Sequence, residues 1–476
     1  MSRDPPGADF TGTLRELLGA GGLLTGEACA PFLTDHRGLY HGRAVGVALP
    51  RSVEQVSGVL TACHAHRVGV VPHGGNTGYC GGATPDESGR QLVLALARLN
   101  RVRSIDADNY SLIAEAGCVL EQVQRAAEEA GRFFPLSLGS EGSCQIGGNL
   151  STNAGGVSVL RYGMMRELVL GLEVVLADGR VLPCLSGLRK DNTGYDIRAL
   201  FLGAEGTLGV ITAASLKLFP RLRSTATALV ALPDVRAAVA LLGRLRETSG
   251  DRVSSFELIP RIGIDLTTRH IPGVSDPLGR PYAWYVLCEL GSAAEREPLE
   301  TLLADALGAA LEAGVVLDAA VTRSERERDA LWKLRETIPE AQRREGAGLK
   351  HDISVPISAL AEFVERGAAW VRAHVPEAVL VAYGHVGDGN LHFNLTQAPG
   401  TDGAALLARG EPVRRALHGL ACELGGSFSA EHGIGRLKVD ELERYAPPVE
   451  LALMRAVKRA FDPHGIMNPG KVLRGE

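Results

Sequence analysis

Residues 70–82 read VVPHGGNTGYCGG, a short apolar run that passes directly into a loop with five glycines in nine positions. A run of valines favours a strand. Glycine lets successive backbone N–H groups converge and lets a ligand approach the main chain closely. The loop contains neither lysine nor arginine. Such a strand and loop are typical of a site that binds a pyrophosphate through backbone groups alone.

Two further glycine clusters follow this loop along the chain. Residues 139–156 read GSEGSCQIGGNLSTNAGG, and residues 203–209 read GAEGTLG. Any one glycine-rich loop is explained equally well as a tight turn. Three of them in one chain favour a cradle in which two loops hold one diphosphate.

Two known nucleotide-binding motifs, one absent from the chain and one incomplete, indicate which dinucleotide the loops bind. The fingerprint G-x-G-x-x-G of nicotinamide-binding Rossmann domains does not occur in the chain. Residues 465–472, GIMNPGKV, approach a nucleotide P-loop, but Val472 cannot coordinate magnesium and Pro469 lacks the backbone N–H. FAD bound by a fold other than the Rossmann fold is therefore the best fit.

Composition narrows the class of protein. The chain has 476 residues, 58 of them glycine, with 45% hydrophobic and 22% charged residues, which is typical of a globular protein of two or three domains. A net charge of -5 without a basic run excludes nucleic acid as an expected partner. No apolar stretch reaches 18 residues, and the N-terminus lacks a signal-peptide pattern. We expect no membrane span and a cytoplasmic location.

Hydrophobic periodicity divides the chain into two α+β domains. We expect a helical N-terminal segment over 1–41, a first domain over 42–220, a second over 221–440 and a returning tail over 441–476. In the second domain, helices are expected on one face of an antiparallel sheet, and residues 325–344 predict one long charged helix. The strands expected in the first domain are 68–71, 92–96, 112–116, 172–177 and 210–219.

Residues 72–82, 142–156 and 201–212 together resemble the FAD-binding domain of the vanillyl-alcohol-oxidase and p-cresol-methylhydroxylase superfamily. The resemblance implies an α+β fold with a two-subdomain FAD-binding domain and an α+β cap domain. It also implies noncovalent FAD, with His73 as a structural loop residue. The implied cofactor-binding residues are Pro72, Gly74, Gly75, Asn76, Thr77, Gly78, Gly82, Gly142, Ser143, Ile146, Gly147, Gly148, Asn149, Asn153, Ala154, Gly155, Gly156, Glu205, Gly206, Ile211 and Asn468.

A second constellation lies in residues 383–395, YGHVGDGNLHFNL. Asp-Gly at 388–389 is a strong hairpin signal, and a two-residue turn there would pair His385 directly with His392. Imidazoles on opposed residues of one face are close enough to share a divalent metal. Asn394 lies on the same face by the period-2 rule, whereas the intervening apolar residues point to the core.

Residues 429–435, SAEHGIG, supply an acid and an imidazole side by side. Two histidines and Glu431 would leave an open coordination position, as a catalytic zinc site requires. A pair of hydrogen-bonded core histidines with an unrelated Glu-His dipeptide remains the alternative.

These segments look like those of the D-2-hydroxyacid dehydrogenase branch of the superfamily, which includes D-2-hydroxyglutarate and D-lactate dehydrogenases and the glycolate oxidase D subunit. The resemblance implies Zn²⁺ or another divalent metal on His385, His392 and Glu431, with His432 as the catalytic base. It implies substrate binding by Arg335, Lys350 and Asn394. Pro339 departs from the pattern, because a hydroxyl residue is expected at that position in 2-hydroxyglutarate enzymes.

The expected function is FAD-dependent oxidation of a small D-2-hydroxy acid to the 2-oxo acid. Two alternatives stay open: a flavin-adduct transferase like alkylglycerone-phosphate synthase, and a flavin-free zinc hydrolase. An electron-transferring flavoprotein or a quinone/cytochrome system is the expected electron acceptor, and a homodimer is one assembly considered.

Overall fold

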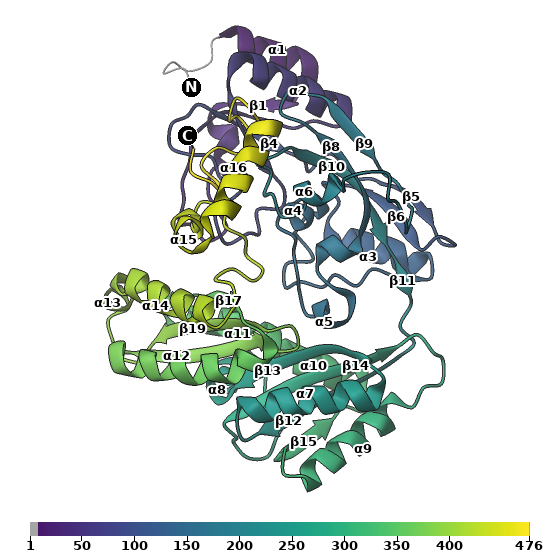
Figure 1. The fold of residues 1–476 in the computed structure, drawn as a ribbon, viewed down its shortest axis with the longest axis vertical. Helices are drawn as coiled ribbons and strands as arrows, with labels where there is room; N and C mark the ends of the chain where they lie inside the picture. The colour runs from purple at the N-terminus through teal and green to yellow at the C-terminus, as the bar shows by residue number, and fades with distance from the viewer. Residues whose placement is uncertain (1–7, 476) are drawn as a thin grey trace. The chain divides into compact units, whose positions relative to one another are not determined.

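A computed structural model describes residues 8–475, which form two compact units (Figure 1). The first unit comprises residues up to Gly156, then Gly163–Arg221 and Glu431 onward, and the second comprises Val157–Tyr162 and Leu222–Ala430. The first seven residues of the predicted segment 1–41 lie outside the described part of the chain. The chain passes from the first unit to the second after Arg221 and returns to the first after Ala430. The boundaries expected from periodicity were at 220 and 440.

The N-terminal part of the first unit is a small sheet covered by helices. Its strand order is β1-β2-β4-β3, in which β2 and β3 each pair with β4 in parallel. Buried residues of α1 and α2 pack on it, and α2 begins at Ser52, whose hydroxyl caps the N–H of Gln55. The elements are α1 (Ala8–Leu18), β1 (Leu23–Leu24), η1 (Gly26–Phe32), β2 (Ala44–Ala48), α2 (Val53–His66), β3 (Gly69–His73) and β4 (Gln91–Ala95).

A second sheet in the first unit is antiparallel, with the order β5-β6-β10-β8-β9. A turn at Asp178–Gly179 joins β8 to β9. The elements are β5 (Val102–Asp106), β6 (Ser111–Glu115), α3 (Leu120–Glu129), β7 (Arg132–Phe133), α4 (Ile146–Ser151), η2 (Met165–Leu168), β8 (Val169–Val175), β9 (Val181–Cys184), α6 (Arg198–Phe201), β10 (Val210–Lys217) and β11 (Phe219–Pro220).

The C-terminal tail belongs to this unit through α15 (Val439–Tyr445) and α16 (Pro448–Phe461). Beyond α16 the chain runs beside β3: the N–H of Val70 donates to Ile466 O at 2.7 Å, and the N–H of Asn468 donates to Val70 O at 2.8 Å. Asp462 accepts from the N–H groups of Ile466 and Met467 and so fixes the turn.

The second unit is built on an eight-stranded sheet with the order β15-β12-β14-β13-β18-β19-β16, and β17 also pairs with β19. Every pairing is antiparallel, as expected. The strands are β12 (Ser224–Leu232), β13 (Val253–Pro260), β14 (Trp284–Ser292), β15 (Asp318–Val321), β16 (Gly348–Leu349), β17 (Asp352–Ser354), β18 (Ala378–His385) and β19 (Asn390–Gln397).

Helices cover both faces of this sheet, so the expectation of helices on one face is wrong. Buried residues of α7, α9, α12 and α14 share one core with the sheet, and those of α8, α10 and α11 share another. All residues of β13 are buried, which requires cover on both sides. Figure 1 shows α7 and α12 along one face. The helices are α5 (Val159–Tyr162), α7 (Val235–Ser249), α8 (Arg261–His270), α9 (Leu299–Glu312), η3 (Ile357–Ala359), α12 (Leu360–His374), α13 (Gly403–Ala408) and α14 (Gly410–Glu423).

The long helix predicted over 325–344 is two helices, α10 (Glu325–Glu336) and α11 (Ile338–Glu345). Pro339 stands in the first turn of α11, where its missing N–H costs no helical bond, but it cannot continue a helix from the preceding turn. The helix therefore restarts at Ile338, after the cap residue Thr337. Within residues 8–475, no helix is both long and apolar enough to cross a membrane.

Candidate active site

The three glycine clusters of the first unit line one pocket. Residues 72–78 at the end of β3 form one side, and the start of α4 with residues 205–211 forms others. The residues that line this pocket include no lysine or arginine. The pocket therefore offers a ligand mainly backbone groups, amides and hydroxyls.

Glycines in this pocket serve two different purposes. A Cβ on Gly75 would lie 2.2 Å from the carbonyl oxygen of Ser143, so this glycine permits the two loops to pack against each other. A Cβ on Gly78 or Gly148 would meet nothing within 4 Å. These two positions face space that a ligand can enter.

A buried amide oxygen indicates that the pocket fits a ligand with a hydrogen-bond donor, such as the N–H of a flavin ring or a ribityl hydroxyl. The side-chain oxygen of Gln145 lines the pocket, is buried, and accepts no hydrogen bond within the described chain. A buried polar atom of this kind is normally satisfied. The donor set and the glycine cradle together fit a dinucleotide.

Most of the predicted cofactor-binding residues line the pocket, and some do not. Residues outside the lining are Gly142, Ser143, Ile146, Asn153, Ala154, Gly155, Gly156 and Asn468. The sequence did not single out Leu96 and Ala116, which line the pocket and directly follow β4 and β6. Their position at the end of a strand was the signal that could have identified them. The missed residues are Cys80, Gly81, Ala83, Leu96, Ala116, Ser151 and Thr152.

His432 also lines the pocket, within the same unit. Its ring lies 4.7 Å from the ring of Tyr79, edge to face. The turn that follows His432 is held by Glu205, whose carboxylate accepts from the N–H groups of Ile434 at 2.7 Å and Gly435 at 2.8 Å. Burial raises the pKa of Glu205 to about 7, although these two donors partly oppose the shift.

The predicted histidine hairpin forms with a different register. Strands β18 and β19 pair Tyr383, not His385, with His392. The connection is wider than two residues, because the N–H of Asp388 donates to His385 O and the N–H of Gly389 donates to Val386 O. The shift is two residues, so the faces are unchanged. His385 and His392 are diagonal neighbours with ring centroids 5.5 Å apart.

His385 and Arg335 are both tied to one buried carboxylate, that of Glu257 on β13. The Nδ1 of His385 is 2.7 Å from Glu257 Oε1, and the Nη2 of Arg335 is 2.6 Å from Oε2. Burial alone would raise the pKa of Glu257, but the charges and hydrogen bonds of His385 and Arg335 lower this pKa to about 2. Glu257 was not singled out from the sequence, since no local motif marks it.

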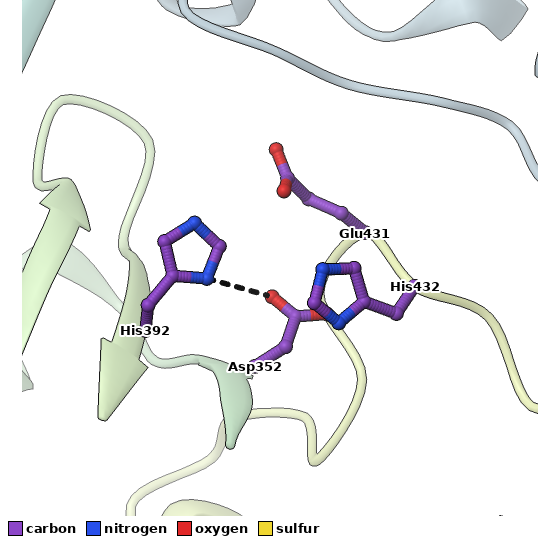
Figure 2. Close-up of side chains that lie close together, drawn as sticks. All are labelled: Asp352, His392, Glu431 and His432. Carbon is purple, nitrogen blue, oxygen red and sulfur yellow. Dashed lines mark ion pairs between the residues drawn. The ribbon is translucent and has the colours of Figure 1, made fainter. Parts of the chain in front are cut away.

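His392 lies beside a second carboxylate. Its Nδ1 is 3.9 Å from Asp352 Oδ1, the ion pair that Figure 2 marks, and Asp352 also accepts from the side-chain amide of Asn390 at 2.9 Å. The N–H of Ala430 donates to the carbonyl of Asp352. Glu431 follows Ala430 directly and begins the C-terminal segment of the first unit.

The remaining predicted substrate residues lie in different environments. Asn394 is buried and accepts from the N–H of His351 at 3.1 Å, while its amide donates to Gln342 at 3.1 Å. Lys350 is exposed and directly follows β16. Asn394 therefore holds the segment that carries Lys350.

Two family models match the chain. The C-terminal domain of FAD linked oxidases matches residues 221–472, and an FAD binding domain matches residues 44–185. Together they cover both units.

Curated relatives with high similarity share one name. D-2-hydroxyglutarate dehydrogenase of Bos taurus, named mitochondrial, is 42% identical over 89% of this chain and 76% of its own. The Arabidopsis thaliana protein, also named mitochondrial, is 39% identical over 92% of this chain and 77% of its own. The Xanthomonas citri enzyme is 38% identical over 90% of this chain and 89% of its own.

Solved structures show the same fold at low identity. p-Cresol methylhydroxylase with substrate bound has a TM-score of 0.74 at 18% identity, covering 98% of this chain and 96% of its own. An alkyldihydroxyacetonephosphate synthase has a TM-score of 0.74 at 16% identity, covering 98% of this chain and 86% of its own. The expected fold class is confirmed.

The expectation of a cytoplasmic location is contradicted, because plant and animal relatives are named mitochondrial. The physical reason is that composition and hydropathy do not distinguish one aqueous compartment from another.

Proposed function

Because the chain belongs to the FAD-linked oxidase family, in which it is an FAD-dependent D-2-hydroxyacid dehydrogenase, we propose that D-2-hydroxyglutarate is its substrate and 2-oxoglutarate its product. The observation that carries the choice of substrate is the shared name of relatives up to 42% identical over most of the chain. Oxidation removes a hydride from the α-carbon and a proton from its hydroxyl. When bound, FAD supplies the hydride acceptor.

His432 is the proposed base for the hydroxyl proton. Its place in the lining of the pocket that fits FAD supports this role. A neutral imidazole is a common general base in enzymes. The Tyr79 ring on one side and the turn fixed by Glu205 on the other restrict where the imidazole can point.

The proposed metal ligands are His385, His392 and Glu431, with zinc as the first candidate. The short distance between the two imidazole rings supports sharing of one ion. Glu257 engages Nδ1 of His385, so Nε2 is the nitrogen proposed to bind the ion. A divalent ion there would lower the pKa of the substrate hydroxyl.

Arg335 and Lys350 are the proposed carboxylate-binding residues. Glu257 occupies the Nε and Nη2 groups of Arg335, so the Nη1 group is the one proposed to bind a substrate carboxylate. Pro339 brings no hydroxyl to this part of the site. Lys350 is therefore assigned the larger share of contact with the distal carboxylate.

The proposed electron acceptor is an electron-transferring flavoprotein or a quinone/cytochrome system, and the proposed assembly is a homodimer. The first point is checked by mixing the enzyme, its substrate and a purified electron-transferring flavoprotein and measuring reduction of that acceptor. Light scattering of the enzyme checks the second.

Anaerobic titration with substrate tests the function. D-2-hydroxyglutarate is expected to bleach the flavin absorbance near 450 nm, with kcat/KM higher than for D-lactate in a dye-linked assay. The L-enantiomer is the matched control. A flavin that stays oxidised with every D-2-hydroxy acid would contradict the proposal and favour adduct chemistry of the transferase type.

A further inference from the structure

Glu257 is a buried carboxylate that connects two residues of the proposed site. It lies in the middle of β13, with 1% of its surface exposed. Its Oε1 faces His385 at 2.7 Å, and its Oε2 faces Nε of Arg335 at 2.8 Å. These partners come from β18 and α10. A buried ion pair is generally a poor source of stability compared with packed apolar residues. Its presence on the site face of the sheet calls for another role.

We propose that Glu257 is a positioning residue, which holds His385 in the tautomer that can bind a divalent cation and holds Arg335 in the orientation that binds the substrate carboxylate. This inference rests on the proposed function of the same site.

The tautomer follows from hydrogen-bond chemistry. A carboxylate only accepts hydrogen bonds, so Nδ1 of His385 must carry the proton that it donates to Glu257. In this tautomer the lone pair lies on Nε2, the atom proposed to bind the metal. Carboxylates that accept from the second nitrogen of a ligating histidine fix both its tautomer and its ring orientation.

The same carboxylate fixes the guanidinium of Arg335. Two of its nitrogens, Nε and Nη2, converge on Oε2 of Glu257, and the guanidinium lies 4.9 Å from the centre of the Tyr383 ring. A planar group held along one edge and one face has a single remaining direction for Nη1. Glu257 therefore couples the metal ligand to the substrate-binding cation.

Glu257→Gln separates this role from simple space filling. An amide has one accepting oxygen and one donating nitrogen, and Arg335 presents only donors. The amide oxygen will therefore turn toward Arg335, and the amide nitrogen will donate to Nδ1 of His385. That exchange moves the imidazole proton to Nε2, which then cannot bind a metal.

Glu289→Gln is the matched control. Glu289 lies on the neighbouring strand β14 and accepts from the indole N–H of Trp332 on α10 at 3.1 Å and from Thr227 at 2.9 Å. Its carboxylate thus also contacts α10, but it has no histidine among its hydrogen-bond partners in the described chain. The control variant is expected to bind metal as the wild type does.

The test compares the affinity of the flavin-loaded wild type and both variants for Zn²⁺ and Co²⁺ by competition with a chelating dye. Flavin content and melting temperature serve as the check on folding. Glu257→Gln is expected to lose at least tenfold in metal affinity and to show a higher KM for D-2-hydroxyglutarate. A loss smaller than tenfold in folded protein overturns the proposal.

A measurement on the wild type keeps the proposal testable if Glu257→Gln does not fold. In the Co²⁺-loaded protein, the Nδ1 proton of His385 should give a hyperfine-shifted, slowly exchanging N–H signal in the proton NMR spectrum, because Glu257 buries and accepts it. The absence of such a signal, with cobalt bound, overturns the proposal.

Failure of the proposed function is recognised separately. A wild type that binds metal but whose flavin is not reduced by D-2-hydroxyglutarate overturns only the choice of substrate. A wild type that binds no divalent metal overturns both the metal site and the positioning role.

Discussion

At the scale of single residues, His432 gives the most direct test of the proposed chemistry. His432→Ala removes the proposed base, and general-base catalysis is typically worth about 10²–10⁴-fold. The rate of flavin reduction at saturating D-2-hydroxyglutarate is expected to fall by that factor, as measured by stopped-flow absorbance. Flavin content should be unchanged.

His36→Ala is the control for this substitution. His36 is exposed and contacts the Tyr79 ring on which His432 packs, with ring centroids 5.7 Å apart. Its removal should leave the rate of flavin reduction within about twofold. A rate for His432→Ala within tenfold of wild type would count against the base assignment.

The raised pKa of Glu205 predicts that the free energy of unfolding depends on pH. Burial raises its pKa from 4.5 to about 7, so the folded state holds the proton more tightly than the unfolded state. The stabilisation is complete below about pH 4.5 and is lost as the pH rises through 7. A pKa shift of this size corresponds to a change of roughly 3 kcal/mol in the free energy of unfolding. Glu205→Gln does not titrate, so its free energy of unfolding should lack this decrease between pH 4.5 and 7.

The measurement is chemical denaturation of the wild type and the variant across that pH range, compared as a difference so that common titrations cancel. Glu205→Gln should also be less stable at all pH values, since an amide cannot accept from both Ile434 and Gly435. Parallel curves for the two proteins would disprove the assigned titration.

At the scale of elements, the glycine loops predict two separable defects. Gly75→Ala places a Cβ 2.2 Å from the Ser143 carbonyl, and such overpacking typically costs about 1–3 kcal/mol. The melting temperature of the FAD-free protein should therefore drop. Gly78→Ala meets no atom within 4 Å, so stability should be retained while FAD affinity decreases.

Thermal melts of the FAD-free proteins and flavin fluorescence titrations measure the two effects. Gly131→Ala would not serve as a control, because Gly131 has a φ of 69° and any side chain there is strained. Gly12 in α1, which also has open space, is suitable. Unchanged FAD affinity in Gly78→Ala would refute the placement of the ligand.

Single elements were predictable where local chemistry determines them. The strand that leads into the loop at 74 and the alternation of faces in the hairpin were both expected and occur. The hairpin register was wrong by two residues because β18 is also held by β13, where Glu257 pairs with His385. A tertiary partner thus overrides the turn preference of Asp388–Gly389.

At the scale of the whole molecule, the division of the chain into two units predicts that the metal and the flavin can be removed independently. The proposed histidine ligands belong to the second unit, and the pocket that fits FAD belongs to the first. Dialysis against a strong chelator is expected to abolish turnover of D-2-hydroxyglutarate while the flavin spectrum remains. Zinc or cobalt should restore activity.

Chelation is followed by metal analysis, visible absorbance and the dye-linked assay on one sample. Dialysis without chelator is the control. Full turnover in protein shown to be free of metal would remove the metal role from His385, His392 and Glu431.

The sequence by itself determined the glycine cradle, the α+β class, and the residue types of the site, because glycine conformation and the period-2 alternation of strands are local properties. The resemblance of its motifs then indicated the flavoprotein family. Only the tertiary structure decided the hairpin register, the division of α10 from α11, the cover on both faces of the second sheet, and the contacts of Glu257 with His385 and Arg335. Glu257 lies 128 residues from His385 and 78 from Arg335, and no local pattern encodes an ion pair over such separations.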